Sequence, residues 1–187
     1  MFTAFLIKYA EIGVKGRNRY LFEDALVDQI RFALSKIDGE FAVRKTQGRI
    51  YVDAQSAFDF DETVEALKKV FCISGICPVV YVEDEGFEKL SGTIVNYVKT
   101  VYPEGNKTFK VCARRARKNY PMTSMEINAE LGGRILDACP NMSVDVHDPD
   151  VMVHVEIRNQ INIYSSEIPG PGGMPAVSYT HLRAPET

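Results

Sequence analysis

The chain has 187 residues, of which 45% are hydrophobic and 25% are charged, and its formal net charge is −3. This composition is typical of a soluble protein with one large domain or two small ones. A sequence pI near 5.7 excludes a general polycation, so nucleic-acid binding would have to come from a local basic patch. No apolar run approaches the roughly 20 residues of a membrane-spanning helix, and residues 2–7 lack the length and flanks of a signal peptide. We therefore expect a cytoplasmic protein that does not contact a membrane.

The residue types used for catalysis and metal binding are present but are not grouped in the sequence. The cysteines show no C-x-x-C pair and no Cys/His spacing of a zinc site, so we expect reduced, mostly buried thiols. His147 and His154 have no partner at metal-ligand spacing. Asp145, Asp148 and Asp150 bracket a proline in a predicted turn, where carboxylates commonly bond local amides. We therefore predict no catalytic residue and no metal site in this chain.

The first 83 residues show strand and helix patterns in alternation. The predicted elements are a strand at 2–9, a basic loop at 10–19, a helix closed by Asp38-Gly39, strands at 41–46 and 49–54, a helix, and a strand at 77–83. Gln47-Gly48 is the expected turn of a hairpin, and Asp61 is the expected N-cap of the second helix. The order βαββαβ is the split-βαβ or ferredoxin-like pattern.

A second α/β pattern begins at Gly86. Its predicted elements are a helix at 87–101, a strand at 107–113, a basic loop at 114–120, a helix ended by Cys139-Pro140, and strands at 143–147, 151–158 and 161–165. Thr123 and Glu126 form a predicted capping box for the second helix, whose buried line should be Ile127, Leu131 and Ile135. Gly132-Gly133 disfavours a helix by roughly 1 kcal/mol per Gly, which suggests that protein or ligand backbone approaches closely there.

Basic residues are concentrated in the middle of the chain. Six Lys or Arg residues and no acid lie between Lys107 and Lys118, beside a helix N-terminus that favours phosphate. The primary candidates for phosphate contacts are Arg114, Arg115, Arg117 and Lys118, and the weaker candidates are Lys107, Lys110 and Arg134. Asn119 and Tyr120 could hydrogen-bond to or stack on a nucleotide. A solvated loop is the alternative, and RNA is the favoured partner.

A smaller basic group lies near the start of the chain. Scattered solvated charges are the favoured interpretation of this group, and the alternative is an accessory RNA contact through Lys15, Arg17 and Arg19. Near the other end, residues 168–175 read IPGPGGMP and should form an extended, stiff connector rather than a strand or helix.

Three stretches carry a resemblance to a known family. They are KYAEIGVKGRNRYLFEDAL at 8–26, TFKVCARRARKNYPMTSMEINAELGGRIL at 108–136 and HDPDVMVHVEIRNQINIYSSEIPGPGGMP at 147–175. Together they resemble the N-terminal half of bacterial tRNA 4-thiouridine synthase, a tRNA uracil 4-sulfurtransferase that is also linked to thiamine thiazole synthesis.

The resemblance implies an α+β fold of the α/β sandwich type. It places a ferredoxin-like domain at 1–76, a THUMP domain at 77–166, a linker to a missing catalytic domain at 167–176, and a foreign or disordered tail at 177–187. It implies tRNA, held by the acceptor stem, as the partner, and weakly a homodimer. The missing domain would use ATP, and sulfur from a cysteine desulfurase persulfide, to modify uridine 8.

The sequence departs from the family where the chemistry would occur. The ATP-binding Ser-Gly-Gly-x-Asp-Ser motif and the later catalytic cysteines are absent, so the resemblance carries no catalytic residue and no cofactor onto this chain. We expect no sulfurtransferase activity from the chain alone. Two other interpretations stay open: a THUMP module of another RNA-modifying enzyme, and a ferredoxin-like regulatory module that binds a small ligand.

Overall fold

The computed structural model describes residues 2–9, 19–46 and 49–172, and these residues divide between two compact units. The N-terminal unit contains Ile7–Ile76 and the residues from Pro169 onward, and the central unit contains the residues before Ile7 together with Cys77–Ile168. Two strands, β1 (Ala4–Tyr9) and β4 (Ile73–Val82), contribute residues to both units. The connection of the units therefore runs through strands as well as loops.

The N-terminal unit has the predicted βαββαβ order. After β1 come α1 (Arg19–Leu34), β2 (Phe41–Thr46), β3 (Arg49–Ala54), α2 (Phe60–Leu67) and β4. Its strands follow the order β2-β3-β1-β4. The β2–β3 hairpin is antiparallel, with Phe41 opposite Ala54 and Thr46 opposite Arg49, and the predicted turn at Gln47-Gly48 lies outside the described residues. The ferredoxin-like pattern read from the sequence is confirmed.

The start of α2 and the end of α1 differ from the sequence prediction. The N-cap of α2 is Asp59 rather than Asp61, because the Asp59 Oδ1 accepts a 2.8 Å hydrogen bond from the Glu62 amide. Asp61 instead lies in the first turn, where its charge suits the helix dipole. Helix α1 ends at Leu34, before the predicted stop, and the Ile37 amide donates to the carbonyl of Leu34 three residues back. The last turn is thus tightened beyond α-helical geometry.

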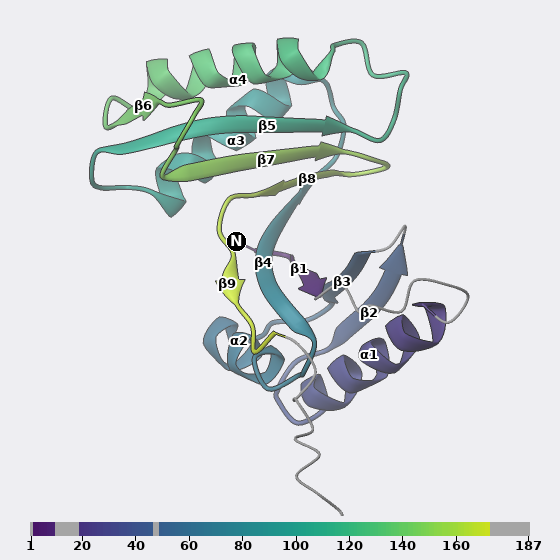
Figure 1. The fold of residues 1–187 in the computed structure, drawn as a ribbon. Helices are drawn as coiled ribbons and strands as arrows, with labels where there is room; N and C mark the ends of the chain where they lie inside the picture. Colours follow the sequence, from purple (N-terminus) through teal and green to yellow (C-terminus); the bar gives the residue numbers. More distant parts are fainter. Residues whose placement is uncertain (1, 10–18, 47–48, 173–187) are drawn as a thin grey trace, which may run out of the picture. The chain divides into compact units, whose positions relative to one another are not determined.

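The central unit is a five-stranded sheet with two helices on one face (Figure 1). Its remaining elements are α3 (Phe87–Val101), β5 (Lys107–Arg115), α4 (Ser124–Ala138), β6 (Met142–Val144), β7 (Val151–Ile157) and β8 (Ile161–Tyr164). The strand order is β4-β8-β7-β5-β6. Strand β5 runs parallel to β6 and β7, whereas β8 is antiparallel to β7 and β4.

The core of the central unit lies between this sheet and its two helices. The predicted apolar line of α4, made by Ile127, Leu131 and Ile135, is completely buried against Phe109 and Val153 of the sheet. The predicted capping box is present, since Thr123 Oγ1 accepts from the Glu126 amide at 3.2 Å and Glu126 accepts from the Thr123 amide at 2.6 Å. These predictions are confirmed.

Strand β5 is two residues longer than its apolar pattern predicts. It continues through Arg114 and Arg115, which stand opposite Glu156 and Ile157 of β7. The prediction that both arginines belong to a loop is wrong. Pairing with β7 satisfies their backbone groups whatever their side chains are, so the ladder extends past the end of the apolar alternation.

The start of the IPGPGGMP segment is a strand rather than a free connector. Ile168 and Pro169 form β9, which pairs with β4, and the Gly170 and Gly172 amides then donate to Ser74 and Ile73 carbonyls at 3.1 and 2.8 Å. The expectation that proline and glycine exclude a strand here is wrong, because a two-residue edge strand tolerates a proline. The predicted tail at 177–187 lies outside the described residues.

Two smaller expectations also have an outcome. A Cβ built on Gly132 or Gly133 would meet no atom within 4 Å among the described residues, so no protein backbone approaches the Gly pair and that part of the prediction is wrong. The free thiols of Cys72, Cys77 and Cys139 are buried and that of Cys112 is half-buried, as expected. In the described part of the chain, no helix is both long and apolar enough to cross a bilayer.

Candidate nucleic-acid interface

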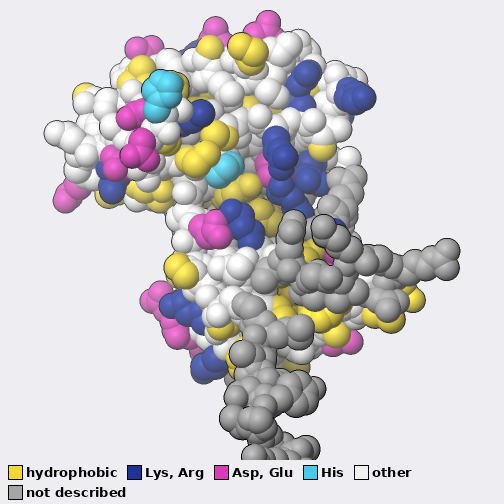
Figure 2. Space-filling model, viewed as in Figure 1, with side chains coloured by type: hydrophobic (Ala, Val, Ile, Leu, Met, Phe, Trp, Pro, Cys, Tyr) yellow, Lys and Arg dark blue, Asp and Glu magenta, His cyan; other side chains and the backbone are white. Residues whose placement is uncertain are grey.

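Cationic side chains gather where β5 and β7 end, on the central unit (Figure 2). Because the two strands are parallel, their carboxyl ends meet at the same edge of the sheet. Arg114, on β5, is exposed, and Lys118, in the following loop, is also exposed. Neither side chain forms a hydrogen bond or ion pair with any described residue. Both charges are therefore available to a ligand.

Arg115 points to the opposite face of β5 and is half-buried. Its Nε is buried and has no hydrogen-bond partner among the described residues. The pKa of Glu126 lies below its usual value, mainly because the carboxylate accepts hydrogen bonds from Thr123 and to a smaller degree because the Arg115 charge is near. Arg115 thus lies close to the first turn of α4, where its positive charge stabilises the ionised carboxylate of Glu126.

Arg117 is engaged within the unit rather than free. Its Nη2 donates to the Oδ2 of Asp84, and both side chains are largely covered, with 34% and 24% of their surfaces exposed. Its guanidinium carbon also lies 5.8 Å from the centre of the Tyr120 ring, within cation–π range. Within the described residues, Arg117 is the one of the four primary candidates that forms an ion pair with a carboxylate.

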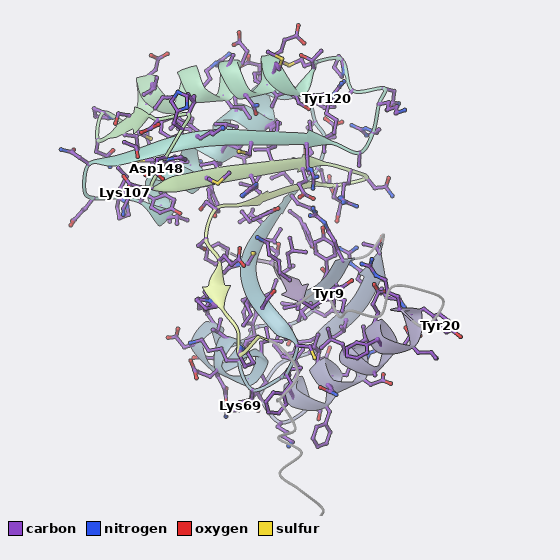
Figure 3. All side chains as sticks on the ribbon, viewed as in Figure 1. Tyr9, Tyr20, Lys69, Lys107, Tyr120 and Asp148 are labelled. Atoms are coloured by element: carbon purple, nitrogen blue, oxygen red, sulfur yellow. The ribbon has the colours of Figure 1, made fainter. Side chains whose placement is uncertain are left out.

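Tyr120 is part of the core and cannot serve as a stacking platform. Only 6% of its surface is exposed, and Figure 3 shows it beside the start of α4. Burial and, after it, the charge of Asp84 raise the pKa of its hydroxyl. The expectation that Tyr120 stacks on a nucleotide is wrong, because the ring fills the space under the loop. Asn119 is exposed.

The weaker candidates do not join this group. Lys107 is at the opposite end of β5 from Tyr120 (Figure 3), about 26 Å from Arg115 at roughly 3.3 Å per residue. The Lys110 Nζ donates to the carbonyl of Val146 at 3.0 Å. Arg134 on α4 forms hydrogen bonds of 2.7 and 3.2 Å to the carboxylate of Glu88. The sequence cluster is therefore spread over the two ends and both faces of the sheet.

The N-terminal basic group is described only in part. Lys15 and Arg17 lie outside the described residues. Arg19 opens α1 instead of lying in a loop, and its Nε donates to Glu23 at 2.9 Å. Glu23 also accepts from the hydroxyl of Tyr9 at 2.8 Å. Burial alone would raise the pKa of Glu23, but these two hydrogen bonds hold it below its usual value.

Sequence reasoning missed two charged residues at the end of the sheet. Arg158 follows β7 directly, and its Nε donates to Glu156 at 3.3 Å. Asp84, the partner of Arg117, precedes α3 by three residues. Neither residue stands out in the sequence, because a single arginine before a turn and an acidic residue in an acidic stretch are both common on protein surfaces.

The aspartates differ in their partners: Asp150 accepts hydrogen bonds from the amide and hydroxyl of Thr108 at 2.8 and 3.0 Å, so the prediction of local amide bonding is wrong for this carboxylate. Asp145 accepts hydrogen bonds from the amides of His147 and Asp148 at 2.8 and 3.1 Å, so the prediction of local amide bonding is confirmed for this carboxylate. His154 stacks on Tyr164 with ring centres 4.7 Å apart. Within the described ranges, no three His, Cys, Asp or Glu residues are grouped closely enough to hold a metal ion.

Comparison with known proteins identifies both units. Residues 4–77 match the family model of the ThiI ferredoxin-like domain, and residues 85–165 match that of the THUMP domain. A probable tRNA sulfurtransferase of Lachnospira eligens is 63% identical over 176 residues, which are 94% of this chain. The chain spans only 45% of the length of that relative.

Solved structures agree with these matches. A crystal structure of a 4-thiouridine synthetase in complex with RNA and bound ATP is 33% identical, with a TM-score of 0.79 over 94% of this chain and 44% of that one. PH1313 from Pyrococcus horikoshii is 32% identical, with a TM-score of 0.75 over 92% of this chain and 57% of the other. The chain therefore carries a ThiI ferredoxin-like domain and a THUMP domain, and over both domains it is similar to probable tRNA sulfurtransferases.

Proposed function

We propose that this chain holds tRNA for a tRNA uracil 4-sulfurtransferase. The whole protein would make 4-thiouridine at position 8 with ATP and sulfur from a persulfide carried by a cysteine desulfurase, and would also serve thiamine thiazole synthesis. The part described here would grip the acceptor stem. A homodimer remains part of this proposal, as does the absence of sulfur transfer by the chain alone.

One observation carries the proposal: Arg114 and Lys118, two cations with no partner in the described part of the chain, stand at the end of the sheet in a THUMP domain. A-form RNA has a deep, narrow major groove that side chains do not read, so such a domain would bind phosphates and 2′-hydroxyls rather than bases. The net charge of −3 makes general attraction weak, and binding would depend on this local group.

The test is the salt dependence of tRNA binding by the complete chain and by the variant Arg114→Ala/Lys118→Ala. Each phosphate contact that is lost should reduce the slope of log K against log salt by roughly 0.7 to 0.9, so the pair should reduce it by roughly 1.4 to 1.8. Different tRNAs should be affected about equally, because phosphates carry no base identity. The measurement is a fluorescence titration at several salt concentrations.

The control is Lys89→Ala/Lys99→Ala, which removes the same charge from α3. Both side chains are exposed, and Lys89 pairs with Glu85 at 3.3 Å. This variant should keep the wild-type slope. If the Arg114/Lys118 variant is folded and retains both the affinity and the slope, the proposal is wrong.

A further inference from the structure

The loop between β5 and α4 contains Arg117, a basic residue whose side chain contacts a carboxylate and an aromatic ring of the protein. The amides of Ala116 and Arg117 both donate to the carbonyl of Ile157, at 2.9 and 3.3 Å. The chain therefore turns away from β7 at this point, and the loop runs on to Tyr120 and the capping residue Thr123. Backbone hydrogen bonds hold its first two residues but none of the next three.

Side chains hold the middle of this loop. Arg117 reaches across to Asp84, whose other carboxylate oxygen accepts from the Gly86 amide at the start of α3, 3.4 Å away. Tyr120, three residues further along the loop, is buried in the core with its ring near the guanidinium. The three side chains connect the loop to the turn before α3 and to the core.

We infer that Arg117 is a positioning residue: the lock formed by Asp84, Arg117 and Tyr120 fixes the loop so that Lys118 faces the RNA on the same side as Arg114 of β5. This inference rests on the proposed function. The guanidinium is shared between a carboxylate and a ring and is largely covered. To bind a phosphate, Arg117 would have to leave Asp84 as a partly buried carboxylate without its partner, which is unfavourable.

The two roles of Arg117 predict opposite effects of removing Asp84. If Arg117 binds a phosphate directly, loss of a neighbouring negative charge should strengthen RNA binding. If Arg117 orders the loop, Asp84→Asn should weaken binding by about three- to tenfold, although it removes a charge that repels RNA. Arg117→Lys separates the same alternatives, because it keeps the charge but loses the planar fork and the ring contact.

The experiment titrates fluorescent tRNA with the complete chain, Asp84→Asn, Arg117→Lys and the combined variant. Each single variant should bind about three- to tenfold more weakly with nearly the wild-type salt slope, and the combined variant should lose no more than either one. Glu85→Gln is the matched control, since it removes an adjacent exposed acid that pairs with Lys89 and not with Arg117. It should bind as tightly as the wild type or slightly more tightly.

Hydrogen exchange of peptides covering 116–122 measures the order of the loop without RNA. Exchange should be faster in Asp84→Asn and Arg117→Lys and unchanged in Glu85→Gln. Tighter binding by Asp84→Asn, or unchanged exchange in the loop, would overturn the lock while leaving the proposed function in place. If the wild-type chain does not bind tRNA at any salt concentration, both the proposed function and this role of Arg117 are wrong.

Discussion

A single carboxylate at the start of α4 links the local sequence to stability. Glu126 accepts a hydrogen bond from the Thr123 amide at 2.6 Å, and this bond together with the nearby Arg115 holds the pKa of Glu126 below its usual value. A carboxylate whose pKa is lower in the folded state stabilises that state when it is ionised. Its contribution is present above the pKa of the unfolded chain and is lost as the pH falls through the folded value.

The variant Glu126→Gln should therefore be less stable than the wild type near pH 7, by about 1–3 °C in Tm. The difference should be constant down to about pH 5 and should shrink below the unfolded pKa near 4.3, as the wild-type carboxyl becomes protonated. Thermal unfolding monitored by circular dichroism between pH 7 and pH 3 measures it. A difference that stays constant through pH 3 would show that the charge does not matter.

At the scale of the element, β9 pairs with β4, and the residues that follow it up to Gly172 continue to bond the start of β4 through backbone hydrogen bonds. A Cβ on Gly170 would lie 2.3 Å from the carbonyl oxygen of Ile73, and a backbone atom cannot move aside as a side chain can. The Gly172 carbonyl accepts from the Cys72 amide at 3.3 Å, so the contact is held on both sides of the glycine. The close approach explains why this position is glycine.

We predict that Gly170→Ala destabilises the protein by about 1–3 kcal/mol, because the strand must shift away from β4. Gly133→Ala is the control with the opposite sign: its Cβ would meet no described atom within 4 Å, and Ala in a helix is more favourable than Gly by about 0.5–1 kcal/mol. Urea unfolding of both variants measures the two changes. Wild-type stability for Gly170→Ala would contradict the close approach.

Gly133→Ala also tests whether RNA backbone occupies the space beside Gly133, where no described protein atom lies within 4 Å of the added Cβ. Loss of tRNA affinity in a stabilised Gly133→Ala variant would assign the Gly pair to the interface. Unchanged affinity would leave the two glycines without a role in binding.

At the scale of the whole molecule, the four cysteines are divided between the two units, and their accessibility can be compared. Cys72 and Cys77 come from β4 and the turn before it, Cys112 from β5 and Cys139 from the end of α4. Burial raises the pKa of the Cys139 thiol, and less than a tenth of the surfaces of Cys72, Cys77 and Cys139 is exposed. The side chain of Cys112 is more accessible.

A thiol reagent at neutral pH should therefore modify one cysteine of four in the native protein, and peptide mapping should identify Cys112. The other three should react about tenfold or more slowly, at the rate of local or global opening, and all four should react at once in denaturant. Rapid native labelling of Cys139 would show that the end of α4 opens more readily than its burial indicates.

The sequence by itself determined the helices and every strand except β9. Apolar residues at helical or alternating spacing marked α1, α3, α4 and these strands, and Thr123 with Glu126 marked a helix start, because these signals depend only on neighbours within about four residues. The resemblance of three stretches then placed the chain in its family. These features needed no knowledge of distant contacts.

Tertiary structure alone decided where the strands end and which cations pair with a carboxylate. Arg114 and Arg115 joined β5 because β7 supplied partners from about 40 residues further along the chain, and Pro169 became part of a strand because β4 was beside it. Arg117 pairs with Asp84 in the turn before α3, and Arg134 pairs with Glu88 on α3. Arg114 and Lys118 have no acidic partner among the described residues. A charge run in a sequence states how many cations are present, but only packing determines which of them a carboxylate already neutralises, since ion pairs form across space and not along the chain.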